Sequence, residues 1–174
     1  MMTFTKVAAV AAIALAGFSG AAQAATVGLT IDTDFVEFNF GASTWDDEFT
    51  FTITDTAYLL VTDIYVSGDM FEVSANGSSL GETSAVPAGA GLYESNPYIA
   101  LFSDDFSSAV FELAAGSYTI SGLVSQAATG FTSGAGAVKL SSFDITAAVP
   151  VPAAGLMLLS ALGGFAGLRR KRKA

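Results

Sequence analysis

The chain contains no histidine and no cysteine, and these two absences exclude several kinds of chemistry. Without imidazole there is no histidine general base and no histidine-ligated metal site. Without thiols there is no cysteine nucleophile, no thiolate metal site and no disulfide bridge. A chain of 174 residues is long enough for one domain of modest size, which an apolar core must then stabilise.

Basic residues are also scarce, and they are unevenly distributed. The chain has 7 Lys and Arg against 16 Asp and Glu. Lys139 is the only base between residues 25 and 148, and all sixteen acids fall in that span. Nucleic acids require clustered Lys and Arg for their phosphates, so this composition excludes a nucleic-acid partner. We expect the acidic span to stay soluble through self-repulsion and to attract cations.

Residues 1–24 have the pattern of a secretory signal peptide. A short segment carrying Lys6 precedes an apolar run over residues 7–18, and small residues then lead to Ala24. Signal peptidase needs small side chains before the bond it cuts, which predicts cleavage between Ala24 and Ala25. The apolar run is short for a bilayer span, which needs about 20 residues. The sequence therefore predicts export, with signal peptidase as a processing partner.

Residues 149–174 have the pattern of a second targeting segment. The rigid segment Val149-Pro150-Val151-Pro152 leads into an uncharged stretch over 153–168, and the basic tail 169–173 follows. The apolar length from residue 149 is about one bilayer thickness. A basic cluster directly after an apolar span stays in the cytoplasm. We therefore expect a transmembrane helix over 153–168 that leaves residues 25–148 outside the membrane.

The order of short proline motif, apolar helix and basic end resembles the PEP-CTERM class of bacterial sorting signals. Val149-Pro150-Val151-Pro152 is similar to the VPLPA variant, with Val151 where that pattern has leucine, and it lacks the glutamate of the original Pro-Glu-Pro motif. The resemblance covers about the last 26 residues. It implies recognition by an exosortase-type membrane transpeptidase in a Gram-negative bacterium that produces exopolysaccharide. The alternative is a plain C-terminal membrane anchor that is never cut.

Residues 25–148 alternate apolar and polar side chains with a period of two, which is typical of half-buried β-strands. Residues 49–54 show the alternation most clearly, and residues 58–66 are apolar on both faces, as in a central strand. We count eight to ten short strands and no helix in this span. This pattern predicts an antiparallel β-sandwich, jelly-roll-like, between the signal peptide and the C-terminal helix.

Turn residues support the same reading. Asn76-Gly77 predicts a tight hairpin, because both central positions of such a turn need a positive φ. Residues 84–97 and 125–136 are rich in small residues and are expected to form loops. Apolar side chains change parity after Leu140, which predicts a bulge near Ser141-Ser142. The stretches 68–84 and 113–120 are similar to segments of secreted PEP-CTERM proteins, which implies extracellular placement and brings no catalytic residues.

We find no enzyme signature. There is no nucleophile elbow and no phosphate-binding loop, and a His-based triad is impossible. A pair of carboxylates is in principle enough to hydrolyse a glycosidic bond, but the chain lacks an evident acid–base constellation. The sequence predicts a protein that is not an enzyme, with a glycoside hydrolase as the most distant alternative.

Two ligands remain as hypotheses. Calcium prefers clustered oxygen ligands, which Asp46, Asp47 and Glu48 offer in one cluster and Asp104 and Asp105 in another. Neither cluster has EF-hand spacing, and the alternative is a solvated acidic surface that protects sheet edges.

Sugar is the second ligand, because Trp45, Tyr93 and Tyr98 lie in or near expected loops, where an aromatic face can stack on sugar. Trp45 beside these acids pairs such a face with acceptors. The alternative is that Trp45 is part of the core.

Together these patterns predict an exported, surface-associated protein with a structural or adhesive role in an exopolysaccharide or biofilm matrix. The alternative is a carbohydrate- or calcium-binding module.

Overall fold

The computed structural model describes residues 24–89 and 91–145. Within these ranges no helix is long and apolar enough to cross a membrane. The predicted transmembrane helix over 153–168 and the motif Val149-Pro150-Val151-Pro152 lie outside the described residues, as does nearly all of the predicted signal peptide.

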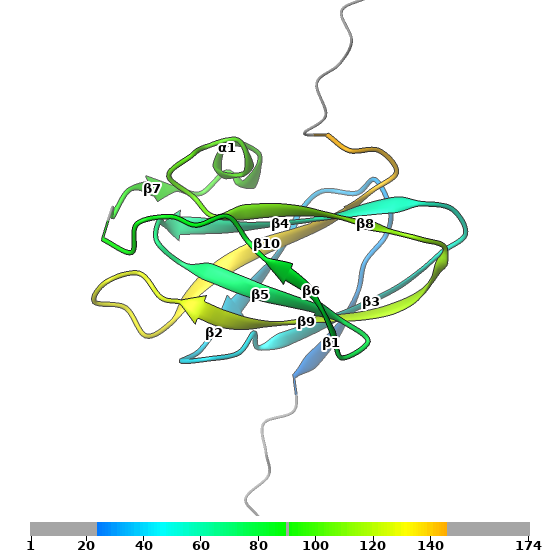
Figure 1. The fold of residues 1–174 in the computed structure, drawn as a ribbon, viewed down its shortest axis with the longest axis horizontal. Helices are drawn as coiled ribbons and strands as arrows, with labels where there is room; N and C mark the ends of the chain where they lie inside the picture. Colours follow the sequence, from blue (N-terminus) through cyan, green and yellow to red (C-terminus); the bar gives the residue numbers. More distant parts are fainter. Residues whose placement is uncertain (1–23, 90, 146–174) are drawn as a thin grey trace, which may run out of the picture.

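The described chain folds into two β-sheets that face each other (Figure 1). The first sheet has the order β1 (Ala25–Gly28), β3 (Asp47–Ile53), β9 (Gly116–Gln126), β5 (Met70–Ala75), β6 (Ser78–Glu82). In the second, β2 (Val36–Phe40) is followed by β10 (Gly134–Ser141) and β4 (Ala57–Val66), whose other edge pairs with β8 (Ser108–Leu113) and then β7 (Tyr93–Glu94). Neighbouring strands are antiparallel except β1 and β3, which are parallel.

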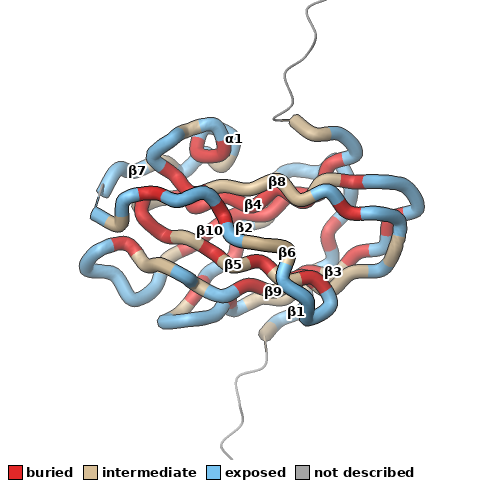
Figure 2. Tube along the Cα trace, in the orientation of Figure 1, coloured by how far each residue is buried: buried red, intermediate tan, exposed pale blue. Residues whose placement is uncertain are grey.

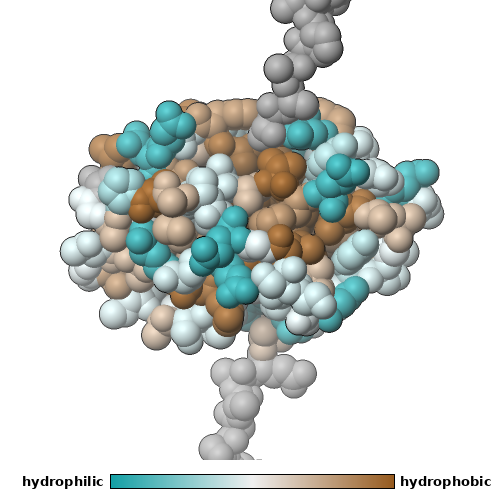
Figure 3. Space-filling model, viewed as in Figure 1, coloured by the Kyte–Doolittle hydropathy of each residue, from teal (hydrophilic) through white to brown (hydrophobic). Residues whose placement is uncertain are grey.

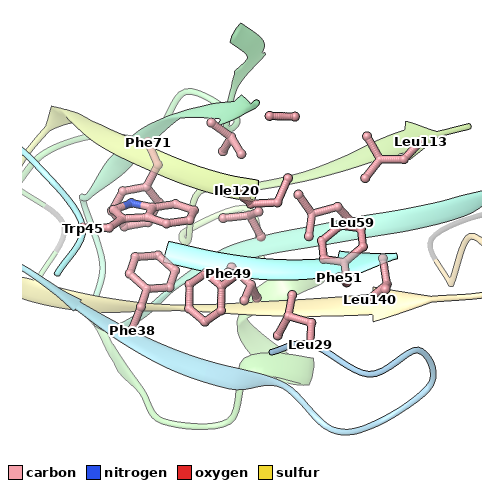
Figure 4. Close-up of a cluster of buried hydrophobic side chains, with 14 of the residues drawn as sticks. Leu29, Phe38, Trp45, Phe49, Phe51, Leu59, Phe71, Leu113, Ile120 and Leu140 are labelled. Atoms are coloured by element: carbon pink, nitrogen blue, oxygen red, sulfur yellow. The ribbon is translucent and has the colours of Figure 1, made fainter. Parts of the chain in front are cut away.

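The core lies between the sheets, as the alternation of apolar residues predicts. Buried residues recur at every second position along β3 and β5 (Figure 2). Trp45, Phe38 and Phe71 gather at one end of this core, and Leu113 and Leu140 lie at the other (Figure 4). The face in Figure 3 shows apolar side chains interspersed with hydrophilic ones. Apolar burial between two sheets supplies the main stabilisation of such a domain.

The prediction that residues 58–66 form a central strand is confirmed. β4 pairs on one side with β10 and on the other with β8 and β7. It sends Leu59 and Val61 into the main core, while Ile64 packs with Ala100 of the short helix α1 (Pro97–Leu101). A strand covered on both faces needs apolar residues on both, which explains its continuous hydrophobicity.

The hairpin at Asn76-Gly77 is also confirmed. Asn76 and Gly77 have φ values of 51° and 78° between β5 and β6, as a two-residue turn with two positive φ angles requires. The Asn76 side chain also spans to β9, where Oδ1 accepts from Thr119 N at 2.8 Å and Nδ2 donates to Ser117 O at 3.1 Å. This one residue therefore shapes the turn and ties it to the sheet.

Two local predictions are wrong. The segment expected to contain no helix holds α1, whose first turn is capped by Asn96 Oδ1 accepting from Tyr98 N at 3.0 Å, with Pro97 at the first position. The expected bulge near Ser141-Ser142 does not form, because β10 ends at Ser141. Ser142 N donates to Asp32 Oδ1 at 2.8 Å instead, and Phe143 stays exposed.

Candidate binding surface

Tyr65 has an unusual backbone conformation near the end of β4. Its φ is 67°, a left-handed value that costs a bulky residue about 1–3 kcal/mol. In a regular strand Tyr65 would share a face with Asp63, two residues earlier, and oppose Ile64. Instead both Tyr65 and Ile64 pack against the cluster that contains Ala135. The positive φ therefore places the ring on the outer face of the second sheet.

There the Tyr65 ring is fixed by two neighbours. Its hydroxyl donates to Glu37 Oε2 on β2 at 2.8 Å, and this hydrogen bond raises the pKa of Tyr65 above its ordinary value. The ring centroids of Tyr65 and Tyr93 lie 5.9 Å apart, with 35° between their planes. Tyr93 on β7 is 70% exposed. We call these two rings the tyrosine pair: an aromatic surface open to solvent, with a carboxylate at its edge.

A groove of about 460 Å³ continues from the tyrosine pair. Tyr65 lines it together with Asn39, Asp46 and Asp69, and the exposed ring of Phe131 stands at its wall. Carboxylate and amide oxygens accept hydrogen bonds from hydroxyl groups, while aromatic faces bind apolar surface. The pair and the groove thus combine the two kinds of contact that a polyhydroxylated ligand needs.

Two carboxylates are buried close to this groove. Asp63, fully buried, accepts at Oδ2 from Gly68 N at 3.1 Å and from Asp69 N at 3.2 Å, whereas its Oδ1 has no partner. Asp69 Oδ1 accepts from Ala128 N at 2.7 Å. Burial, and then the charge of Asp69, raises the pKa of Asp63 to about 8, and burial raises the pKa of Asp69 as well.

The prediction of Trp45 as a sugar platform is corrected by its burial. The indole is 4% exposed and stacks on Phe38, with ring centroids 3.9 Å apart. Its other face approaches Gly122, where even a Cβ would lie 2.2 Å from Cε2. The connection from β2 to β3, which contains Trp45, crosses this end of the core. Isolated β-bridges hold it there, one between Phe40 and Trp45 and one between Thr44 and Leu123. A ring enclosed on both faces cannot stack on a sugar.

The predicted calcium ligands lie at separate places. Asp46, Asp47 and Glu48 line one groove with Ala24 and Ala25 beside the edge strand β1. Asp104 and Asp105 are exposed in the segment that follows α1. Among the described residues, no three acidic side chains come together in an arrangement that could hold a metal ion. Calcium binding stays a prediction without a geometric basis.

Sequence reasoning offered Tyr93 as an aromatic in or near a loop whose face could stack on sugar, and it placed Tyr65 within a strand that is apolar on both faces. The pairing depends on the positive φ of Tyr65, for which a tyrosine gives no local signal. Glu37 lies between Val36 and Phe38 in an alternating strand, a position that predicts exposure and no particular partner. The one sequence signal for this surface was an acidic residue on the outer face of its strand, next to aromatic residues in the same strand.

No protein-family model matches the chain, and no curated protein matches it. Among solved structures, the chain is similar to the pre-peptidase C-terminal domain of a collagenase from Bacillus anthracis. The two share 14% identity with a TM-score of 0.39, and the match covers 68% of this chain and 94% of that one.

Proposed function

We propose that this chain is an exported, surface-associated protein whose jelly-roll-like β-sandwich binds polysaccharide in an extracellular matrix. Its role is structural or adhesive, without catalysis. The observation that carries the proposal is the tyrosine pair, Tyr65 and Tyr93, held side by side on an outer face with Glu37 at its edge.

A pyranose ring has one face of C–H groups and a rim of hydroxyls. The C–H face packs against aromatic rings, and the hydroxyls donate to carboxylates such as Glu37. The φ of Tyr65 and its hydrogen bond to Glu37 fix that ring before any ligand arrives. A surface ordered in advance loses less entropy on binding, which favours weak contacts repeated along a polymer.

The sequence at both ends supports the location. A signal peptide over 1–24 would export the domain, and the PEP-CTERM-like segment 149–174 would hold it at the envelope, at least until an exosortase-type transpeptidase acts. The resemblance of that segment links the chain to exopolysaccharide producers. A polysaccharide ligand is consistent with that setting.

The test is a substitution of the exposed ring. We expect Tyr93→Ala to weaken binding of the full chain to the host's exopolysaccharide about tenfold, because a stacked aromatic contributes roughly 1.5 kcal/mol. Isothermal titration calorimetry with the protein in detergent measures this.

Phe102→Ala is the matched control, because Phe102 is 62% exposed and lies after α1, outside the tyrosine pair. It should bind as the unmodified chain does, with both variants melting at the same temperature. Equal binding by Tyr93→Ala and the unmodified chain would overturn the proposal, as would an equal loss in Phe102→Ala.

A further inference from the structure

The turn at residues 67–69, between β4 and β5, is a meeting point for distant segments. Ser67 N donates to Leu92 O at 2.9 Å, and Leu92 N donates to Ser67 Oγ at 3.0 Å. Gly68 O accepts from Gln126 Nε2 at 2.9 Å, and Gly68 has a φ of 127°. Ser107 Oγ donates to the carbonyl of Asp69 at 2.6 Å. The turn thus joins the approach to β7, the end of β9 and the start of β8.

The two buried carboxylates hold this turn from the inside. Asp63 accepts from two of the three N–H groups of the turn, those of Gly68 and Asp69, through one oxygen. Asp69 in turn accepts from Ala128 N, at the start of the loop 127–133. Three of the segments tied here carry parts of the tyrosine pair and its groove. Tyr65 lies two residues after Asp63, Tyr93 follows Leu92, and Phe131 lies in the loop.

No described cation faces these carboxylates. Asp69 faces Asp63, and Asp46 shares the groove with Asp69. Lys139 of β10 is on the outer face, where Nζ donates to Thr33 O and lies 5.6 Å from the centre of the Tyr98 ring. The other acidic side chains of the adjoining elements and of the segment after α1 are exposed or half-buried: Glu37, Glu72, Glu82, Glu94, Asp104, Asp105 and Glu112. Segments 84–89 and 127–133 contain no titratable side chain.

We propose that a proton on the buried pair Asp63 and Asp69 holds the 67–69 turn in place. Loss of this proton releases the turn and weakens polysaccharide binding at the tyrosine pair and its groove. We call the protonated pair the latch. Regulation of binding rests on the proposed function, whereas the latch itself does not. Ionisation of both groups would place two like charges in the interior. It would also leave Asp63 Oδ1, which has no donor, as part of a buried anion.

The direction in which pH changes the stabilisation by this proton follows from the raised pKa of Asp63. Its folded-state pKa of about 8 lies above the ordinary 3.8, so the folded chain binds this proton more tightly than the unfolded chain does. The resulting stabilisation is complete below about pH 4, decreases as the pH rises, and is lost above about pH 8. The latch is therefore closed under neutral conditions and opens in alkali.

Hydrogen exchange of the full chain in detergent tests the latch directly. Between about pH 6 and pH 9.5, we expect protection of the Gly68, Asp69, Leu92 and Ala128 amides to fall about tenfold, after correction for intrinsic exchange. Asp63→Asn should abolish this dependence, because its neutral amide keeps an acceptor for the turn and cannot ionise. Asp104→Asn, an exposed counterpart, should behave like the unmodified chain. A flat profile in the unmodified chain, or an unchanged one in Asp63→Asn, would overturn the latch.

Asp69→Asn provides a second variant if Asp63→Asn does not fold. Removing the Asp69 charge lowers the pKa of Asp63, so the loss of protection should move to lower pH. An unmoved midpoint would contradict the pairing. Polysaccharide binding over the same pH range tests the coupling, and protection lost without weaker binding would overturn that step. Failure of the Tyr93→Ala test would instead refute the proposed function and leave the exchange result intact.

Discussion

At the scale of single residues, glycines in strand interiors make room for aromatic rings. A Cβ at Gly136 would lie 2.3 Å from Phe38 Cζ, and one at Gly122 would lie 2.2 Å from Trp45 Cε2. These distances are far below van der Waals contact. Since Phe38 and Trp45 stack on one another, both rings are enclosed between the two sheets by backbone without side chains.

Replacing Gly122 with alanine should therefore destabilise the fold. We expect Gly122→Ala to lower the free energy of unfolding by at least about 1–3 kcal/mol, because the indole cannot retreat from Phe38. Urea unfolding followed by tryptophan fluorescence measures the change. Gly28→Ala is the control, because Gly28 lies in β1 with nothing within 4 Å of its Cβ position. Equal stability of Gly122→Ala and Gly28→Ala would show that the ring is not confined.

Trp45 also shows what residue patterns leave undetermined. Its neighbours Asp46 and Asp47 make the segment look like an exposed loop, and the choice between core and surface depends on its place in the fold. The indole is buried because the connection from β2 to β3 crosses the end of the core next to β9. That contact joins residues far apart in sequence, so local composition carries no trace of it. The same holds for the pairing of Tyr65 with Tyr93.

At the scale of elements, the strands follow from period-two alternation, and the exceptions are short or irregular. α1 has five residues, too few for a 3.6-residue period to be visible, although Asn96-Pro97 is a recognisable start signal. β10 ends at Ser141 because Ser142 bonds Asp32 from another segment. The register of strand pairing shifts at 70–71 and 73–74 of β5 instead. Apolar residues continue at every second position through both places, so the sequence does not mark them. Local signals therefore predict regular pairing better than its interruption.

The β5–β6 hairpin depends on Asn76 for its conformation and for its hydrogen bonds, and two substitutions separate these roles. Asn76→Gly keeps the positive φ and loses the bonds to Thr119 N and Ser117 O. Asn76→Ala loses the bonds and also suffers the left-handed penalty, about 1–2 kcal/mol. We expect Asn76→Ala to be less stable than Asn76→Gly by about that amount in urea unfolding. Equal stabilities would mean that the turn changes type without cost.

At the scale of the whole molecule, the positions of the two ends of the described range, near residues 24 and 145, bear on processing. β1 begins at Ala25, so cleavage after Ala24 would leave every described strand intact. Ala25 N donates to Asp46 O at 3.2 Å, and a new α-ammonium group at this position keeps donors for that bond. The start of β1 and the end of the described chain near residue 145 lie on opposite sides of the molecule (Figure 1). A domain held at its C-terminal side would therefore present the β1 side away from its attachment.

Mapping the terminal peptides of the native protein by mass spectrometry distinguishes its possible mature forms. We expect a first residue of Ala25, because the small side chains before it suit signal peptidase. We expect a last residue between 149 and 154, where the PEP-CTERM-like motif lies. Removal of the basic tail would then leave a mature domain whose only base is Lys139, a strongly acidic surface that repels anionic lipid. A last residue of Ala174 would mean that the segment is an uncut membrane anchor, and the sorting resemblance would be misleading.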